Sequence, residues 1–239
     1  MAKNAKNAKN AGSGKGAVSA KKQRPKTRAP RVKGFFLVID GIDGSGKGTI
    51  LSLLHDWFLA QGVPPGRLLL TAEPTSGAYG RRIRELLRSG ADPHARAREL
   101  LNLYIKDRKE HISRAILPAL SAGKIILCDR YKYSTIAYQS AQGLDKGKLI
   151  SLHKKMPVPN LALILDLPVE EALSRISSDS SRSGKDVFER SAFLEKVRAN
   201  FLALKEELPK EKIAVIDASG TKEEVFGRVL AAVKKSAAI

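Results

Sequence analysis

Short apolar runs alternate with amphipathic helical patterns from Gly34 to the end of the chain. Five runs of five or six residues are rich in Ile, Val and Leu: 35–40, 67–71, 124–129, 161–166 and 212–217. Continuous apolar runs of this length are typical of strands covered on both faces, as in parallel sheets. The pattern therefore predicts five buried strands that pair in parallel.

Helical periodicity fills the segments between these runs. Apolar residues recur at the spacing of one helix face in 50–58, 169–176 and 194–208, and Thr221 with Glu224 forms a capping box before a last helix. Strands that alternate with helices predict an α/β fold, with a doubly wound five-stranded parallel sheet and flanking helices.

About fifty residues separate the second and third strands, which is too long for a simple crossover. We expect two or three helices there, around 80–88 and 92–122. An insertion near the carboxyl edge of a parallel sheet is a suitable place for a substrate subdomain. No boundary interrupts residues 34–239, which we interpret as one domain.

The composition fits a globular protein. Hydrophobic residues make up 43% of the 239 positions, enough for the core of one large domain. No apolar run approaches the roughly 20 residues of a membrane-spanning helix, and the first residues lack the apolar segment of a signal peptide. The single cysteine, Cys128, excludes an internal disulfide. We expect a soluble, cytoplasmic protein without membrane insertion.

Much of the net charge of +19 lies in an N-terminal tail. Residues 1–33 contain eleven Lys or Arg and no acid, whereas the remaining 32 basic and 24 acidic residues give +8. The tail has little to bury, so we expect it to be disordered. Two interpretations stay open: nonspecific contact with nucleic acid or an anionic surface, and a solubilising extension without a partner.

The clearest chemical motif follows the first strand. It reads Gly41-Ile42-Asp43-Gly44-Ser45-Gly46-Lys47-Gly48-Thr49. Glycines let the backbone curl until its amides converge on phosphate oxygens, and the positive end of the next helix adds to their field. The preceding strand and the following helix identify a P-loop, whose Lys47 is expected to reach the β and γ phosphates of ATP.

Gly48 departs from the usual P-loop, in which a Ser or Thr after the lysine binds Mg²⁺. Thr49 comes one residue later, and the carboxylate of Asp129 ends the third strand. We expect these two residues to hold the metal, directly or through water, and Arg130 beside them to hold a phosphate.

Further motifs carry a resemblance to a known family. In chain order they are Glu73-Pro74-Thr75, Asp107-Arg108 with His111, Asp129-Arg130-Tyr131, and Ser134-Thr135 with Ala137-Tyr138-Gln139. With the P-loop they make residues 34–235 resemble the thymidylate kinases. The resemblance implies Mg²⁺-dependent transfer of the γ-phosphoryl group of ATP to dTMP, giving dTDP and ADP for dTTP synthesis.

The resemblance also implies roles for residues near the sugar and phosphate of dTMP. Asp43 resembles the carboxylate that binds the 3′ hydroxyl, and Tyr138 flanks the sugar. Arg84 and Arg130 clamp the monophosphate, while Glu73 lies near this phosphate and the waters of the metal. Structural alternatives remain, such as turn capping for Asp43 and packing for Tyr138.

A second group is expected around the base. Tyr104 precedes Arg108 by four residues, so on a helix the two share a face, and one base can stack on the ring while it hydrogen-bonds the guanidinium through a thymine carbonyl. Thr135 and Gln139 resemble the residues that read the other base edges. For Tyr104 the alternative is a place in the core.

Residues 177–190 resemble the lid of the family, which closes over the phosphates. Family members without an arginine in the P-loop supply cations from the lid, and this P-loop has none. The resemblance therefore implies that Arg182 and Lys185 stabilise charge on the transferring phosphoryl group, with a plain solvated loop as the alternative. The adenine is expected between Arg175 and the loop 218–220.

Other functions stay open at this stage. One is a kinase for another nucleoside monophosphate, such as dUMP, or for a deoxynucleoside. Another is a nucleic-acid-associated P-loop ATPase that uses the basic tail. By analogy with the family we expect a homodimer.

Overall fold

The computed structural model describes residues 34–89, 95–177 and 187–236. The predicted tail and most of the predicted lid, including Arg182 and Lys185, lie outside these ranges.

One sheet forms the centre of the fold. Its strands are β1 (Phe35–Gly41), β2 (Leu68–Ala72), β3 (Ile125–Asp129), β4 (Leu161–Asp166) and β5 (Ile213–Asp217). All pairs are parallel and the order is β2-β3-β1-β4-β5, so that β1 lies in the middle. The predicted five-stranded parallel sheet is confirmed, and the P-loop strand is adjacent to the strand that ends in Asp129.

The two edge strands depart from the prediction that every strand is covered on both faces. Leu70 on β2 is 48% exposed and Val215 on β5 is 37% exposed, whereas the side chains of β1 are almost entirely buried. An edge strand has a neighbouring strand on one side only, which leaves part of its surface uncovered. A run of apolar residues does not distinguish an edge strand from a central one.

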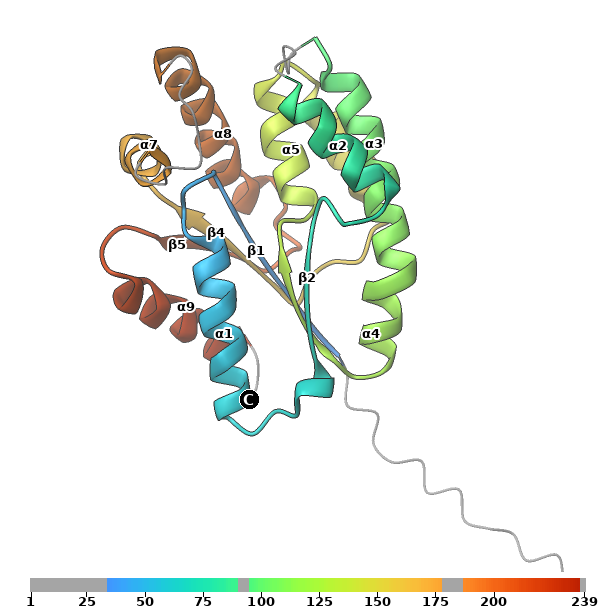
Figure 1. Cartoon of the computed structure of the whole chain (residues 1–239), viewed down its shortest axis with the longest axis vertical. Helices are drawn as coiled ribbons and strands as arrows, with labels where there is room; N and C mark the ends of the chain where they lie inside the picture. The colour runs from blue at the N-terminus through green and yellow to red at the C-terminus, as the bar shows by residue number, and fades with distance from the viewer. Residues whose placement is uncertain (1–33, 90–94, 178–186, 237–239) are drawn as a thin grey trace, which may run out of the picture. The chain divides into compact units, whose positions relative to one another are not determined.

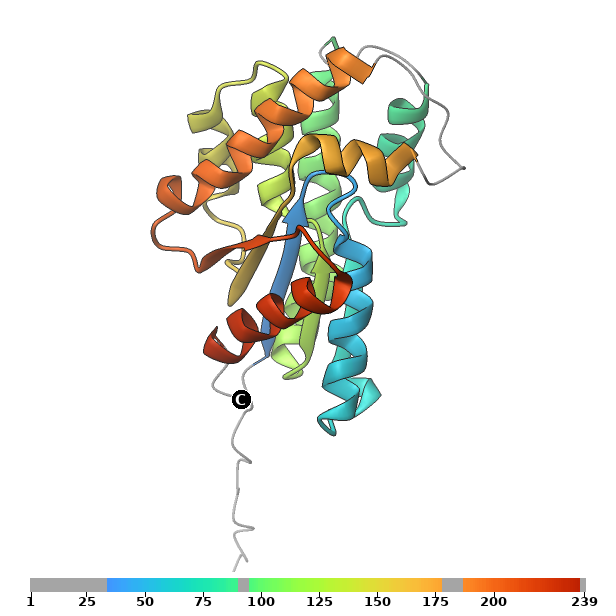
Figure 2. The same ribbon diagram turned by 90° about the vertical axis from the view of Figure 1, so that its left-hand side faces the viewer.

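Helices cover both faces of the sheet, with α1 and α9 on one face and α4, α5 and α8 on the other (Figures 1 and 2). The α-helices are α1 (Lys47–Ala60), α2 (Ala78–Arg88), α3 (Ala97–His111), α4 (Leu117–Ser121), α5 (Lys132–Ala141), α6 (Lys146–His153), α7 (Val169–Ser177), α8 (Val187–Glu207) and α9 (Lys222–Ser236), with a 3₁₀ turn η1 (Pro65–Arg67) and a π-helical turn η2 (Ile112–Ile116). The doubly wound arrangement is confirmed.

The capping box before α9 is also confirmed. The backbone N–H of Thr221 donates to Glu224 Oε2 at 2.8 Å, and the N–H of Glu224 donates to Thr221 Oγ1 at 3.3 Å. Each side chain thus satisfies an amide that the helix itself leaves without a partner.

The insertion between β2 and β3 contains α2, α3, η2 and α4, and Figure 1 shows α2 and α3 side by side beyond the end of β2. These two helices share a small apolar cluster of their own, in which Ile83, Leu86 and Leu100 are buried and Leu103 and Tyr104 pack against them. The expected subdomain is present and stands at the carboxyl edge of the sheet.

A buried ion pair joins α5 to the loop before β5. Lys132 Nζ lies 2.6 Å from Glu211 Oε1, and the hydroxyl of Tyr133 donates to Glu211 Oε2 at 2.6 Å. Burial lowers the pKa of Lys132, and the hydrogen bond that Lys132 donates to Glu211 opposes that shift. The charge of Lys132 is therefore tolerated in the interior because one carboxylate compensates it.

We expect Glu211→Ala to lower the free energy of unfolding by about 3–5 kcal/mol, since it leaves the buried ammonium of Lys132 without a counter-charge. Urea unfolding followed by circular dichroism measures the change. Glu211→Gln, which keeps hydrogen-bonding atoms in place, serves as the control and loses less. A loss below about 1 kcal/mol in the alanine variant, the range of exposed pairs, would contradict the assignment.

Candidate functional site

The P-loop connects the end of β1 to α1 and encloses Lys47. Gly44 is required by geometry: it has a φ of 83°, and a Cβ added there would lie 2.5 Å from the backbone oxygen of Ala172. Lys47 Nζ donates to the carbonyl oxygens of Gly41 at 3.2 Å and Ile42 at 2.7 Å. Burial, together with the nearby charge of Arg130, lowers the pKa of Lys47 to about 8.

Asp40 anchors the base of this loop, a role that the sequence analysis did not assign. Its buried carboxylate accepts hydrogen bonds from the N–H groups of Gly41, Tyr131 and Ser134 at 3.1 Å each, and from the hydroxyl of Ser134. Burial raises the pKa of Asp40, and Arg130 together with the bonds from the Ser134 hydroxyl and the Tyr131 N–H opposes the rise. One carboxylate thus joins the P-loop, the turn after β3 and the start of α5.

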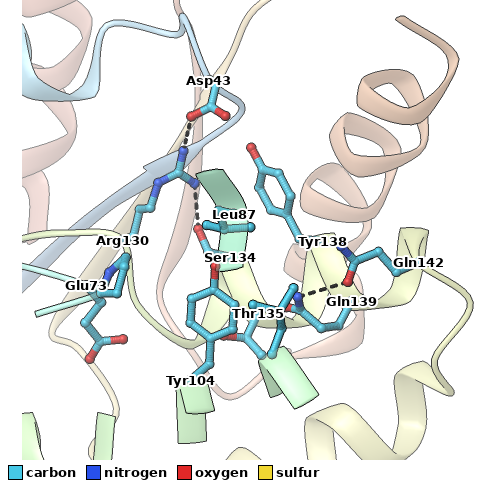
Figure 3. A pocket seen from close by; sticks show the side chains of 12 residues that line it. Asp43, Glu73, Leu87, Tyr104, Arg130, Ser134, Thr135, Tyr138, Gln139 and Gln142 are labelled. Atoms are coloured by element: carbon cyan, nitrogen blue, oxygen red, sulfur yellow. Dashed lines mark hydrogen bonds and ion pairs between the residues drawn. The ribbon is translucent and has the colours of Figure 1, made fainter. Parts of the chain in front are cut away.

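The turn after β3 aims Arg130 into the site. Its φ of 64° is the one positive φ of a non-glycine residue in the described part of the chain. The guanidinium donates to Asp43 Oδ1 at 2.6 Å and to Ser134 Oγ at 2.8 Å, as Figure 3 shows, and lies 5.5 Å from the ring centroid of Tyr138. Arg130 is therefore fixed between the P-loop and α5.

One pocket, of about 680 Å³, opens over the P-loop. It is lined by residues predicted for ATP and metal, namely Asp43, Gly44, Ser45, Gly46, Lys47, Gly48, Thr49, Asp129 and Arg175, and by Arg130, which was predicted to bind the monophosphate. Gly41 and Ile42 are not in this lining, and their carbonyls bind Lys47 instead. Lys222 and Val225 line the pocket as well and were missed, because no motif marks the start of α9 as part of a site.

Figure 3 shows a second pocket, of about 220 Å³, which shares Asp43 and Arg130 with the first. Seven residues predicted for dTMP line it: Asp43, Glu73, Tyr104, Arg130, Thr135, Tyr138 and Gln139. Pro74, Leu87, Leu100, Ser134 and Gln142 complete the wall and were not predicted. Leu87 and Leu100 come from the insertion, so α2 and α3 form one side of this pocket, and their role could be found only from the fold.

Two predicted residues, Arg84 and Arg108, do not line the second pocket. Arg84 donates to the carbonyl oxygens of Pro74 at 2.8 Å and Thr75 at 2.7 Å. Arg108 is 1% exposed and bonds Glu73 and Thr135, which do line the pocket. This placement differs from the expected direct contacts, because Arg84 is occupied by backbone carbonyls and Arg108 by side chains of its neighbours.

Glu73 is held in a polar network beneath the pocket. Its Oε2 accepts from Arg108 Nε at 2.7 Å, and its Oε1 lies 3.0 Å from His111 Nδ1. Thr75 donates from its N–H and its hydroxyl to Asp107 at 2.8 and 2.6 Å. The motif after β2 and the motif on α3 are therefore bound to each other.

The residues over the P-loop fit a bound magnesium ion better than Glu73 does. Asp129 Oδ1 is buried and has no hydrogen-bond partner among the described residues, and Asp129 lines the same pocket as Thr49. An unpaired carboxylate oxygen in a phosphate pocket is suited to Mg²⁺ or its waters. The N–H of Glu73 donates to the carbonyl oxygen of Asp129 at 2.9 Å, but both carboxylate oxygens of Glu73 are engaged by other side chains and Glu73 lines the other pocket.

A parallel sheet with a P-loop at its central strand and a second pocket at the same edge defines the class of P-loop nucleotide kinases. The sequence profile of the thymidylate kinase family matches residues 39–229. The chain therefore belongs to the thymidylate kinase family and is a phosphotransferase.

Similar proteins agree with this classification. A probable thymidylate kinase of Pyrococcus horikoshii is 41% identical over 209 residues, covering 85% of this chain and 97% of that protein. The thymidylate kinase of Desulfotalea psychrophila is 40% identical over 172 residues, covering 72% and 82%. The crystal structure of thymidylate kinase from Ehrlichia chaffeensis superposes with a TM-score of 0.66 at 26% identity, covering 84% of this chain and 99% of that one.

Among the described residues, no helix is both long and apolar enough to cross a membrane. Cytoplasmic location stays a prediction.

His153, at the end of α6, completes the network around Arg108. Its Nδ1 lies 2.7 Å from the carbonyl oxygen of Leu149, and its Nε2 lies 2.7 Å from Arg108 Nη1. Burial, followed by the charge of Arg108 and to a lesser degree that of Lys132, lowers the pKa of His153 to about 3. The folded protein therefore holds this imidazole neutral.

This shift gives a pH dependence of stability. The pKa of His153 falls from 6.5 in the unfolded chain to about 3 in the fold, so between these values the unfolded chain binds a proton that the folded chain does not. The contribution is fully present above pH 6.5 and declines as the pH falls. We expect wild type to lose about 2 kcal/mol more than His153→Gln between pH 7 and pH 5, measured by urea unfolding. Equal losses in the two proteins would contradict this assignment.

Proposed function

We propose that this chain transfers the γ-phosphoryl group of ATP to dTMP, giving ADP and dTDP. The observation that carries the proposal is that Asp43 and Arg130 line both pockets. ATP over the P-loop and dTMP in the second pocket then both contact the guanidinium of Arg130 and the carboxylate of Asp43. Such contact is what in-line transfer between two phosphates requires.

On the donor side, the loop amides and Lys47 bind the phosphates of ATP. Ser45 Oγ is buried without a partner among the described residues and lines the same pocket, so it can donate to a phosphate oxygen. The phosphates replace the carbonyls that Lys47 contacts here. We place the adenine between Arg175 and the segment that contains Ala218 and Gly220, which also lines the pocket.

On the acceptor side, Arg130 binds the monophosphate and Asp43 the sugar hydroxyl, with Tyr138 beside the sugar. No general base is needed, because the phosphate dianion is already a nucleophile. Positioning and electrostatic stabilisation then supply the catalysis.

The base is held between polar groups and the ring of Tyr104. Gln139 Nε2 donates to Gln142 Oε1 at 3.1 Å, which leaves Gln139 Oε1 buried and without a partner among the described residues. This acceptor suits the N3–H of thymine. Thr135, on the same helix, suits the neighbouring carbonyl. A cytosine ring presents the opposite donor and acceptor pattern at these two positions.

Asp129 and Thr49 are the residues that would hold Mg²⁺, directly or through water. When bound, Mg²⁺ neutralises charge that develops on the phosphate oxygens during transfer. Arg182 and Lys185, outside the described residues, remain our candidates for further cations. Dimerisation, and contact of the tail with nucleic acid, also remain predictions.

The first test offers ATP and Mg²⁺ with dTMP, dUMP, AMP, CMP, GMP or thymidine, with and without DNA, and follows ADP release. We expect dTMP to be preferred over CMP by roughly a hundredfold or more in kcat/KM, because the polar groups of the pocket would otherwise stay unpaired. DNA should not change the rates. Activity that requires DNA, or activity with none of the acceptors, would contradict the proposal.

A second test concerns the departure at Gly48. A Cβ added at this residue meets no atom within 4 Å, so the loop has room for a side chain. We expect Gly48→Ser to lower the Mg²⁺ concentration for half-maximal rate by roughly fivefold, since a hydroxyl is added where P-loops usually have one. Gly48→Ala adds the carbon without the oxygen and is the matched control. The same shift in both variants would show that the hydroxyl is not responsible.

A further inference from the structure

Arg108 lies next to the second pocket without lining it, and its donors are directed to three different partners. Nε donates to Glu73 Oε2 at 2.7 Å, Nη1 to His153 Nε2 at 2.7 Å and Nη2 to Thr135 Oγ1 at 3.0 Å. The guanidinium is almost fully buried, and its carbon lies 5.3 Å from the ring centroid of Tyr131. Contacts on several sides leave it little freedom to turn.

The proton positions on His153 follow from its two partners. The carbonyl oxygen of Leu149 can only accept a hydrogen bond, so Nδ1 of His153 carries the proton. A guanidinium can only donate, so Nε2 has no proton and accepts from Arg108. His153 must therefore be neutral and in one tautomer for Arg108 to keep its orientation.

The same reasoning fixes the role of Thr135. Its Oγ1 accepts from Arg108 Nη2, and among the described residues this hydroxyl donates no side-chain hydrogen bond. Thr135 is 1% exposed and lines the second pocket. Its proton is thus available to a ligand in that pocket, and Thr135 acts toward this ligand as a donor.

We propose that His153 is a positioning residue for nucleotide selection: through Arg108 it holds Thr135 as a hydrogen-bond donor toward the carbonyl at position 4 of a pyrimidine. This inference rests on the proposed function. A thymine or uracil ring accepts that bond. A cytosine ring carries an amino group at the same position, which brings two donors together.

Two substitutions at His153 separate its two hydrogen bonds. His153→Gln places a carbonyl oxygen near the former Nε2 and keeps an acceptor for Arg108. His153→Asn places its amide near the former Nδ1, which keeps the contact to Leu149 and withdraws the acceptor from Arg108. Both variants are polar and uncharged, so they form a matched pair.

In steady-state assays with dTMP and dCMP, we expect His153→Asn to raise KM for dTMP about tenfold and to reduce the ratio of the two kcat/KM values by a similar factor. KM for ATP should stay within about twofold, because the P-loop is not touched. His153→Gln should restore the ratio. If His153 had a purely structural role, each variant would instead lose kcat/KM for dTMP and for dCMP to the same extent. The size of that loss would follow the stability of the variant.

A double-mutant cycle with Thr135→Val tests the path. If His153 acts through Thr135, adding His153→Asn to Thr135→Val leaves the ratio unchanged, whereas independent effects would multiply. A multiplied effect, or a wild-type ratio in His153→Asn alone, would overturn the inference. If wild type itself does not prefer dTMP to dCMP, the proposed function fails instead, so the two failures are distinguishable.

Nitrogen-15 NMR of the histidine side chains in the unmodified protein is a check that no folding defect can obscure. The resonances of His153, assigned by their loss in His153→Gln, should show a protonated Nδ1 and an unprotonated Nε2 at pH 7. A charged ring or the opposite tautomer would overturn the inference.

Discussion

The arrangement of the site depends on one buried carboxylate, that of Asp40. It stands at the end of the central strand and accepts backbone N–H groups from the P-loop, from the turn after β3 and from the first turn of α5. Tyr131 and Ser134 follow Asp40 by 91 and 94 residues, so the bonds join the P-loop to a distant part of the chain that bears a different part of the chemistry. A side chain with two acceptor oxygens can join them, because the parallel strands end at the same edge.

Arg130 is the clearest example of what this junction does. Its left-handed backbone is costly for a non-glycine residue and persists because its surroundings hold it. Arg130 N–H donates to the carbonyl oxygen of Ile39, and the N–H of Tyr131, the next residue, donates to Asp40. The backbone is thereby clamped on both sides of the guanidinium, which explains how one side chain can serve two pockets.

Much of the fold and part of the site could be predicted from the sequence. The strands, the P-loop and the capping box of α9 are local patterns, in which neighbours along the chain determine the structure. Arg108 was placed correctly on a helix with Tyr104, but its partners Glu73 and His153 lie 35 and 45 residues away. In the sequence, an arginine whose hydrogen bonds go to distant residues cannot be distinguished from one that binds a substrate. The burial of Arg108 could therefore not be predicted. Leu87 and Gln142 were missed for a related reason, since neither belongs to a motif.

The small cluster between α2 and α3 has a consequence for how a nucleotide enters. Its buried members Ile83, Leu86 and Leu100 form a group separate from the core beneath the sheet. Local opening follows such cooperative units. Within this wall α3 is tied to the rest of the site, because Leu101 and Ile105 pack on the main core and Arg108 bonds Glu73 and Thr135. The side of the acceptor pocket that can loosen while the P-loop and the strands keep their geometry is therefore the one to which α2 contributes Leu87.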